Sequence, residues 1–222
     1  MSEACGDLAG FLLFRVDCPM VPDPSIPITL AGQLLVASPR LADPLFGRSV
    51  CFVMHHDSSG AIGVLLNRPL EVGDQFWKLL QQHPAADSRL EPRGSESQGP
   101  AGWVHFGGPL SGPLVALHCN RQLAEAEPSR GVYLAAQKEH LEQLVRSRSG
   151  TPLRLIVGHA GWSAGKLEAE LAAGFWYPVP ATVERVFEAD DAMWGHLVRT
   201  GVGATLARWV GLDATGFDPT RN

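Results

Sequence analysis

Short apolar runs recur along this chain at close intervals, and their spacing limits the folds that it can adopt. Seven runs have the length, and the content of branched and aromatic residues, that is typical of β-strands. They lie at 33–37, 49–54, 61–66, 103–106, 114–118, 132–135 and 153–157. Most of them are separated by too few residues for the crossover helix that a parallel pair requires, whereas antiparallel neighbours can follow one another through a tight turn. The spacing therefore predicts a mainly antiparallel sheet, or a small barrel or sandwich.

Four segments carry apolar residues at helical intervals, at 74–82, 137–148, 163–173 and 190–200. The third is the clearest, because Ser163 can cap its N-terminus and Gly174 can end it. A last short helix is expected over 204–210. Strands and helices together predict an α+β domain with a sheet core and peripheral helices.

A chain of 222 residues fits one domain, which we place at 30–202. Residues 1–29 form an expected N-terminal arm, because four prolines fall within positions 15–29. The stretch 83–102 is rich in proline, glycine, serine and charge, and we expect a mobile loop there. Residues 203–222 are expected to be a C-terminal extension.

Charge and cysteine usage exclude several classes of protein. Eighteen basic and twenty-three acidic residues give a net charge of −5, and no helix-turn-helix pattern is found, so direct DNA binding is not expected. No apolar run reaches the roughly twenty residues that span a bilayer, so we expect no membrane contact. The four cysteines lack CxxC spacing, and the apolar run 8–14 follows acidic residues rather than basic ones. A cytoplasmic protein with reduced thiols is expected.

Four segments, taken in order, resemble a known family. They are LLVASPRLADPLFGRSV at 34–50, HDSSGAIGVLLNRP at 56–69, FGGPLSGPLVAL at 106–117 and GHAGWSAGKLE at 158–168. The chain resembles the YqgE/AlgH family of bacterial proteins, a group without a settled biochemical activity. The resemblance implies strands wrapped by peripheral helices, and some members have been called transcriptional regulators. Asp57, His159 and Lys166 stand where that family usually has Asn, Tyr and Gln.

The segment 161–165, GWSAG, fits the G-x-S-x-G pattern of serine hydrolases. Asp190 and His196 follow Ser163 in the chain order of one class of catalytic triad. Three residues separate the preceding strand from this turn, however, and the interval from Ser163 to His196 leaves little room for intervening strands. A helix cap is the alternative role of Ser163.

The same segment nearly forms a phosphate-binding loop. Ala160 and Leu167 stand where that loop requires Gly and Ser or Thr, so the nucleotide-hydrolase version fails. A helix N-terminus beside Lys166 is still a candidate seat for an anion. The alternative is a tight turn in which Trp162 is a buried packing anchor.

Other polar turns are candidates as well. Gly107 and Gly108 allow a close backbone approach, and their turn could face 158–165 to form one shallow pocket. His56 ends a predicted hairpin, and Asn67 is expected to bond nearby main chain.

Arg40 and Arg48 flank the turn at Asp43, where a carboxylate–guanidinium pair would stabilise the loop; alternatively, either arginine binds an anion. His105, His118 and His159 lie in or beside predicted strands, but the eight histidines lack metal-ligand spacing, and no metal or cofactor is expected.

We therefore expect a non-enzymatic binding or regulatory protein with a shallow site at the turns 56–60, 107–109 and 158–166, and with a small anionic ligand or a protein as partner. The expected binding residues are His56, Asn67, Gly107, Gly108, Gly158, Gly161, Trp162 and Lys166. The alternatives are a serine hydrolase that uses Ser163, and a protein–protein interaction scaffold with an exposed sheet edge or tail.

Overall fold

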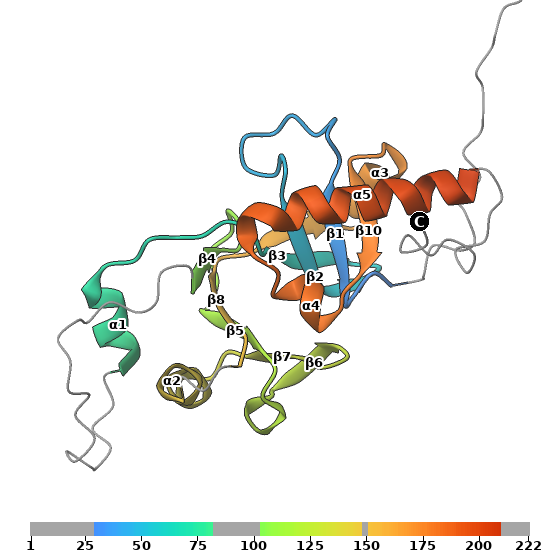
Figure 1. Cartoon of the computed structure of the whole chain (residues 1–222). Helices are drawn as coiled ribbons and strands as arrows, with labels where there is room; N and C mark the ends of the chain where they lie inside the picture. Colours follow the sequence, from blue (N-terminus) through green and yellow to red (C-terminus); the bar gives the residue numbers. More distant parts are fainter. Residues whose placement is uncertain (1–28, 82–102, 148–150, 210–222) are drawn as a thin grey trace, which may run out of the picture.

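Two five-stranded sheets form the core of the protein (Figure 1). The computed structural model describes residues 29–81, 103–147 and 151–209. The expected mobile loop 83–102 lies outside the described residues, as do nearly all of the expected arm and most of the expected C-terminal extension.

The first sheet has the strand order β10–β1–β2–β3–β9, and the second has the order β4–β8–β5–β7–β6. The first comprises Trp176–Pro180, Gln33–Ala37, Val50–Asp57, Gly60–Leu65 and Ala160–Ser163. The second comprises Val104–Phe106, Leu153–Val157, Val115–His118, Val132–Ala135 and Ala126–Ser129. Every described pair of neighbours is antiparallel except β4 and β8. The predicted α+β fold with a mainly antiparallel core is confirmed.

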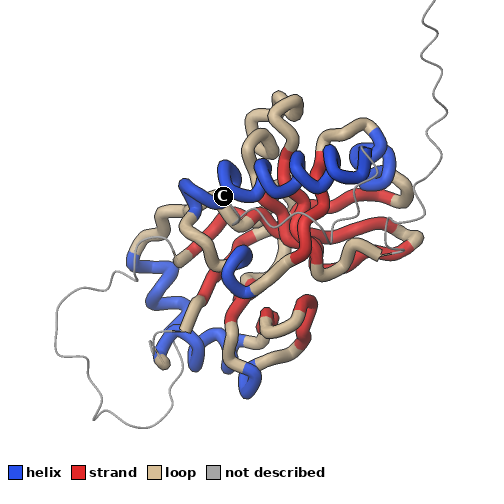
Figure 2. The backbone as a smooth tube through the Cα atoms, turned by 45° about the vertical axis from the view of Figure 1, so that its right-hand side comes forward, coloured by secondary structure: helices blue, strands red, loops and turns tan. Residues whose placement is uncertain are grey.

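Helices cover the outside of this pair of sheets (Figure 2). They are α1 (Asp74–Gln81), the 3₁₀ turn Arg121–Leu123, α2 (Lys138–Arg146), α3 (Lys166–Ala172), α4 (Val183–Val186) and α5 (Asp190–Trp209). The long α5 packs across β1 and β10 of the first sheet. No helix among the described residues combines the length and the apolar character needed to cross a membrane.

The first sheet is buried on both faces, because successive side chains of its strands alternate between two apolar clusters. Leu34 and Leu35 are adjacent and both fully buried, but they belong to different apolar clusters on opposite faces. The cluster around Leu34 joins the two sheets and includes Met193 and Leu197 of α5. The cluster around Leu35 is closed by Leu167 of α3. A third cluster lies between the second sheet and the helices α1 and α2.

Three strands lie where the sequence analysis predicts none. β10 contains Pro178 and Pro180, which a strand tolerates only at a sheet edge, and its only partner in the sheet is β1. β6 is also a short edge strand with a proline. β9 coincides with the glycine-rich segment that the analysis takes for a turn. Short edge strands carry weak apolar periodicity, so pattern alone does not reveal them.

The predicted helix 163–173 begins three residues later than expected. Ser163 is the last residue of β9 and pairs with Gly60 of β3, so it caps no helix. Gly165, with φ of 72°, precedes α3 and makes no side-chain cap. The predicted end at Gly174 is confirmed by its φ of 70° and by its N–H bond to the carbonyl of Leu171.

The two helices predicted at 190–200 and 204–210 are one continuous helix, α5. Gly201 lies between the two predicted ranges. A Cβ at Gly201 would lie 2.6 Å from the Cβ of Tyr177 in β10. This glycine therefore allows α5 to pack closely on β10 rather than ending the helix.

Two glycine turns that are distant in sequence pack main chain against main chain. A Cβ at Gly107 would overlap the carbonyl oxygen of Gly158, and one at Gly108 would overlap the main chain of His159. The N–H of Gly107 also bonds to the carbonyl of Val157 at 2.8 Å. Only glycine fits here, since Gly108 has φ of 148° as well.

We predict that Gly108→Ala lowers the free energy of unfolding by about 3 kcal/mol, because the added methyl meets main chain that cannot move aside and φ is unfavourable. Urea unfolding followed by circular dichroism measures this. Gly195→Ala is the matched control: Gly195 lies in α5 with open space around it, and alanine there is expected to stabilise by about 0.5–1 kcal/mol. Equal effects at both positions would contradict the close packing at Gly108.

Candidate functional site

His56 lies in β2 beside the turn of the β2–β3 hairpin, and its ring bonds to the segment before β1 and to α3. Its side chain is only 6% exposed. Its Nδ1 accepts the N–H of Leu30 at 3.0 Å, so the proton lies on Nε2, which donates to Glu168 Oε1 of α3 at 2.8 Å. Partial burial acts to raise the pKa of Glu168, but the hydrogen bonds from its own main-chain N–H and from His56 lower it overall. Both ring nitrogens of His56 are thus occupied inside the protein.

Trp162 is a packing anchor in β9. Its Nε1 and that of Trp176 both donate to Glu170 Oε2, each at 2.8 Å, and the two rings meet edge to face at 6.0 Å. The Nζ of Lys166 lies 3.5 Å from the other oxygen of Glu170, and its side chain is 60% exposed. The segment that the sequence offers as a candidate anion seat is therefore organised around an internal carboxylate.

Asn67 is tied to the loop that joins β1 to β2. Its Oδ1 accepts the N–H of Val50, and its Nδ2 donates to the carbonyl of Arg48, both at 2.9 Å. The neighbouring Arg68 donates to the carbonyls of Leu45 and Gly47. The expected bond from Asn67 to nearby main chain is observed, and its effect is to shape the loop 38–49.

The structure brings only some of the expected binding residues together. Gly107 and Gly108 contact Gly158, and the exposed Gly161 lies against the side chain of Leu110. His56, Trp162 and Lys166 gather around α3 through Glu168 and Glu170. Asn67 faces the loop 38–49 instead.

The three residues of the alternative catalytic triad have different partners. Asp190 contacts His105 and Arg154, whereas His196 Nδ1 lies 2.9 Å from Glu188 Oε1. Ser163 is exposed at the end of β9. Among the described residues no hydrogen bond joins Ser163, His196 and Asp190 to one another.

A buried polar network that the sequence does not reveal surrounds Arg154 of β8. Arg154 is 6% exposed and donates to the carbonyls of Leu66, Val186 and Glu188 and to Asp190 Oδ1. The Nε2 of the fully buried His105 lies 3.1 Å from Asp190 Oδ2. Burial acts to raise the pKa of Asp190, but the hydrogen bonds from His105 and Arg154 and the charge of Arg154 lower it overall. The network attaches the start of α5 to the second sheet.

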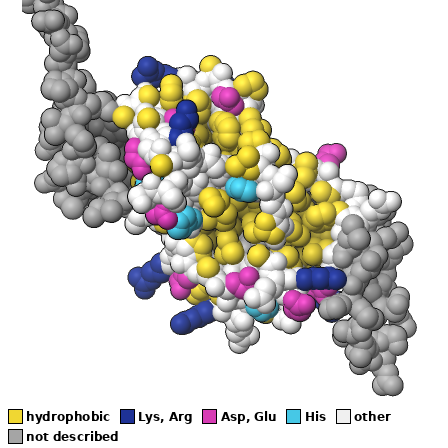
Figure 3. Space-filling model, turned by 180° about the vertical axis from the view of Figure 1, so that it is seen from behind, with side chains coloured by type: hydrophobic (Ala, Val, Ile, Leu, Met, Phe, Trp, Pro, Cys, Tyr) yellow, Lys and Arg dark blue, Asp and Glu magenta, His cyan; other side chains and the backbone are white. Residues whose placement is uncertain are grey.

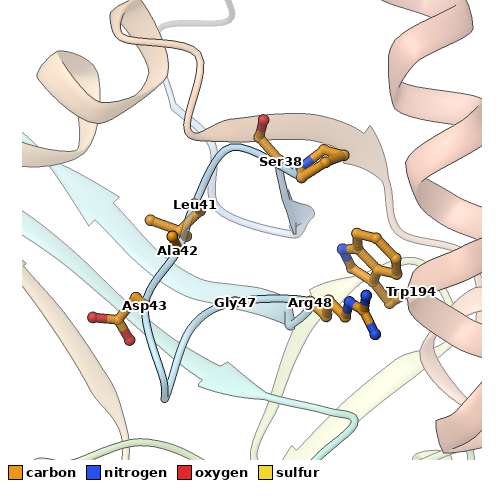
Figure 4. A pocket seen from close by; sticks show the side chains of 8 residues that line it. Ser38, Leu41, Ala42, Asp43, Gly47, Arg48 and Trp194 are labelled. Atoms are coloured by element: carbon orange, nitrogen blue, oxygen red, sulfur yellow. The ribbon is translucent and has the colours of Figure 1, made fainter.

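A pocket of about 370 Å³ lies between the loop 38–49 and α5 (Figure 4). It is lined by Ser38, Pro39, Leu41, Ala42, Asp43, Gly47, Arg48 and Trp194. The volume is in the range of small-molecule sites. All lining residues except Trp194 come from the single loop that Asn67 and Arg68 shape.

Arg48 is the basic side chain among the lining residues, as Asp43 is the acidic one, and its backbone is strained. Its φ is 56°, the only positive φ of a non-glycine residue among those described. Its guanidinium lies over the ring of Trp194, 5.5 Å from the centroid, and no described carboxylate pairs with it. Non-glycine residues in this region of φ and ψ cost free energy and gather at functional sites. Arg48 is therefore the strongest candidate for ligand contact.

The expected pairing of Asp43 with an arginine is not formed. Asp43 Oδ1 accepts the N–H groups of Leu45 and Phe46, each at 2.8 Å, and Figure 4 shows its side chain on the side of the loop away from Arg48. The indole N–H of Trp194 donates to the carbonyl of Ala37 at 2.8 Å. The alternative that the sequence left open, an arginine that binds an anion, stays a prediction. Trp194 had no sequence signal, because it lies 146 positions from Arg48 in the chain.

The histidines in or beside strands have separate surroundings. His105 contacts Asp190, His118 Nδ1 accepts the N–H of Asn120, and His159 lies beside Gly112. In the parts of the chain that the structure describes, no group of three or more His, Cys, Asp or Glu side chains is placed to hold a metal ion.

The fold and this pocket define a two-sheet α+β protein with an arginine–tryptophan site between a loop and a long helix. A family model described as AlgH-like matches residues 34–205, and the chain belongs to the AlgH-like family. The predicted family membership is confirmed.

Relatives and solved structures agree with this assignment. The UPF0301 protein of Chlorobaculum tepidum is 34% identical over 178 residues, 78% of this chain and 87% of that protein. A UPF0301 protein of Xanthomonas campestris is 35% identical over 165 residues, which are 73% of this chain and 84% of that protein. The solution structure of AlgH from Pseudomonas aeruginosa has a TM-score of 0.60 at 22% identity, covering 85% of this chain and 96% of that one. A crystal structure from Corynebacterium diphtheriae has a TM-score of 0.57 at 23% identity, covering 77% and 86%.

The strain at Arg48 predicts that a glycine at this position is more stable than an alanine, the reverse of the usual order. Arg48→Gly and Arg48→Ala both remove the guanidinium, but only glycine adopts φ of 56° without strain. We expect Arg48→Gly to be more stable than Arg48→Ala by about 1 kcal/mol. Thermal unfolding of the two variants side by side measures the difference. A more stable alanine variant would show that the backbone at position 48 is not strained.

The Arg154 network predicts a pH-dependent effect of Asp190→Asn. At pH 7 the substitution is expected to cost about 2–3 kcal/mol of unfolding free energy, because it leaves Arg154 without its carboxylate. The pKa of Asp190 is lowered by folding, so its contribution is present above the unfolded value of about 3.9 and is lost as the pH falls through the lowered folded value.

The difference in stability between the two proteins should therefore be constant above about pH 4.5 and shrink below about pH 4. Urea unfolding at a series of pH values measures it. A difference that persists unchanged at pH 2 would contradict an ionised Asp190 in the folded state.

Proposed function

We propose that this chain is a non-catalytic binding protein that takes a small anionic ligand, with a carboxylate or phosphate group, in the pocket between the loop 38–49 and α5. The observation that carries the proposal is Arg48. Its guanidinium lies over Trp194 in a pocket of about 370 Å³, it has no acidic partner among the described residues, and its backbone is held at a positive φ.

The chemistry of the guanidinium favours this ligand class. The guanidinium lies over the indole ring, and its fork of N–H donors matches the oxygens of a carboxylate or phosphate. The Trp194 N–H is already bonded to Ala37, so the ring supplies a flat apolar surface and no competing donor. A ligand that combines an anionic group with an apolar body suits both surfaces.

The surrounding loop is preorganised for binding. Asp43, Asn67 and Arg68 bond to its main chain and hold its shape without a ligand present. A site that is already formed loses less conformational entropy when it binds. By contrast, the polar groups of His56 and Trp162 at the three turns are already bonded inside the protein. This difference favours the pocket over the turns as the ligand site.

A regulatory role, including the transcription-related one that the family resemblance implies, is compatible with such a module. The net charge of −5 argues for an action through a ligand or a protein partner rather than through direct contact with DNA. The free thiols of Cys51 and Cys119 favour a cytoplasmic location. A serine hydrolase has less support, because Asp190 and His196 bond to residues outside the triad.

The test is thermal unfolding with pyrophosphate and citrate as probes and with glucose as the uncharged comparison. An anion at about 100 times its Kd adds roughly 2.7 kcal/mol, which raises the Tm of a chain this long by about 5–11 °C. Arg48→Ala should abolish the shift, and Arg48→Lys should reduce it, because lysine keeps the charge but loses the planar fork.

Arg40→Ala is the matched control, since Arg40 is an exposed arginine of the same loop that does not line the pocket. It should leave the shift unchanged. Equal shifts in Arg48→Ala and the unmodified protein would reject the pocket as the anion site.

A further inference from the structure

We propose that the outer edge of β9 is a docking site for an extended peptide segment of another protein, which would add as a further strand beside Gly161 and Ser163. This interaction surface is separate from the anion pocket and does not depend on it. It rests on the direction of the main-chain groups of β9, on their exposure and on the apolar side chains beside them.

The direction of the main-chain groups follows from two contacts. The N–H and C=O of His159 both bond to Leu110, each at 3.0 Å, on the side of the chain away from β3. The carbonyl of Trp162 faces Gly60 in β3, close to where a Cβ of Gly60 would lie. In an antiparallel strand the main-chain groups of successive residues point to alternate sides. Those of Gly161 and Ser163 therefore point outward, like those of His159.

This outward edge is open in the part of the protein that the structure describes. Gly161 and Ser163 are both exposed, and no described main-chain group outside the sheet ladder bonds to either of them. The segment at Leu110 pairs with His159, and no described bridge joins it to Gly161 or Ser163. Two residues of β9 thus offer up to four main-chain hydrogen bonds.

Edge strands are usually protected by proline, by charge or by a covering segment. β10 has Pro178 and Pro180, and β6 has Glu127 and Pro128. The outer edge of β4 is covered by the segment 68–70. The N–H of Phe106 donates to the carbonyl of Arg68, and the N–H of Leu70 donates to the carbonyl of Val104. Among the four edge strands described, only β9, with the sequence AGWS, lacks both protection by residue type and a cover along its second half.

Apolar side chains lie on the face that an added strand would extend. Ile62 is the cross-strand partner of Gly161 and is 41% exposed, and Leu110 contacts Gly161 and is 47% exposed. These are two of the three most exposed large hydrophobic side chains described, and hydrophobic side chains gather widely on the back of the molecule (Figure 3). Isolated exposed apolar residues are common, but here they adjoin unpaired main-chain groups.

The partner that fits is an extended segment of about five residues with apolar, β-branched side chains at alternate positions. In an added strand, residues whose main chain faces β9 have their side chains on the face of Ile62. Main-chain hydrogen bonds supply affinity in this mode of recognition, and the alternate side chains supply specificity.

The probe is a seven-residue peptide of alternating threonine and valine with a terminal lysine for solubility. It is titrated into the isotopically labelled full chain while amide NMR shifts are followed. We expect the amides of Gly161 and Ser163 to shift in a saturable manner. Shifts confined to other parts of the chain would overturn the proposal.

A matched pair of variants tests the hydrogen bonds. Ser163→Pro removes the outward N–H but leaves the bonds to β3, whereas Ser163→Ala removes only the hydroxyl. We expect Ser163→Pro to weaken peptide binding about three- to tenfold, as for the loss of one hydrogen bond, and Ser163→Ala to change it less than about twofold. Equal affinities of the two variants would overturn the proposal.

A second arm leaves the protein unchanged, so it holds even if Ser163→Pro fails to fold. Peptides N-methylated on the valines lose the donors that face β9, and peptides N-methylated on the threonines lose those that face away. Only valine methylation should abolish binding. Equal binding of the two methylated peptides would overturn the proposal. So would light scattering that shows the unmodified protein to be a dimer and Ser163→Pro to be a monomer, because a second copy of the chain would then occupy the edge.

Discussion

The position of α5, and with it the candidate ligand pocket, depends on the buried side chain of Arg154. This guanidinium extends from the second sheet and binds carbonyls at the end of the β3 segment, in α4 and in the α4–α5 connection, and it binds the carboxylate of Asp190 at the start of α5. A buried arginine is tolerated only when its donors are satisfied, and here the partners come from two segments that are distant in the chain, Leu66 and the stretch 186–190. Because they must all be in place together, the network specifies one arrangement of the sheets and the helix. Trp194 lies four residues after Asp190, about one turn further along α5, so the same attachment places its ring against Arg48.

The two glycine turns, which the sequence offers as part of a binding site, instead pack against each other. Gly107 and Gly108 meet Gly158 and His159 at distances that leave no room for a side chain, so the space between these turns is filled by main chain. Nearby, one oxygen of Glu170 accepts two indole N–H groups. Polar residues in turns are often bonded internally in this way, because each buried donor or acceptor must find a partner. Arg48 is in the reverse situation: its backbone has a positive φ, and its charged side chain pairs with no described acid.

Much of the fold could be predicted from the sequence, because the apolar runs that become β1, β5, β7 and β8 alternate or cluster as buried strands must. The exceptions have physical causes. β10 contains prolines that only an edge position tolerates, and β9 reads as a glycine-rich turn. The two helices predicted at 190–200 and 204–210 are one, because Gly201 makes space for Tyr177 within a continuous helix. Of the candidate site, the loop arginine could be suspected from its place beside Asp43. Its partner Trp194 could not, since no local pattern connects residues that far apart.

The class of fold, the antiparallel connections and the family could be inferred from the chain alone, because strand length, turn residues and the order of short motifs are local properties. Which polar side chains are bonded internally, and which are left for a ligand or partner, depends on the folded arrangement. That distinction depends on partners brought from distant segments: Leu30 and Glu168 to His56, Glu170 to Trp162, and His105 and Arg154 to Asp190. Hydrogen bonding and burial are properties of the assembled fold, and so the assignment of a site could be made only there.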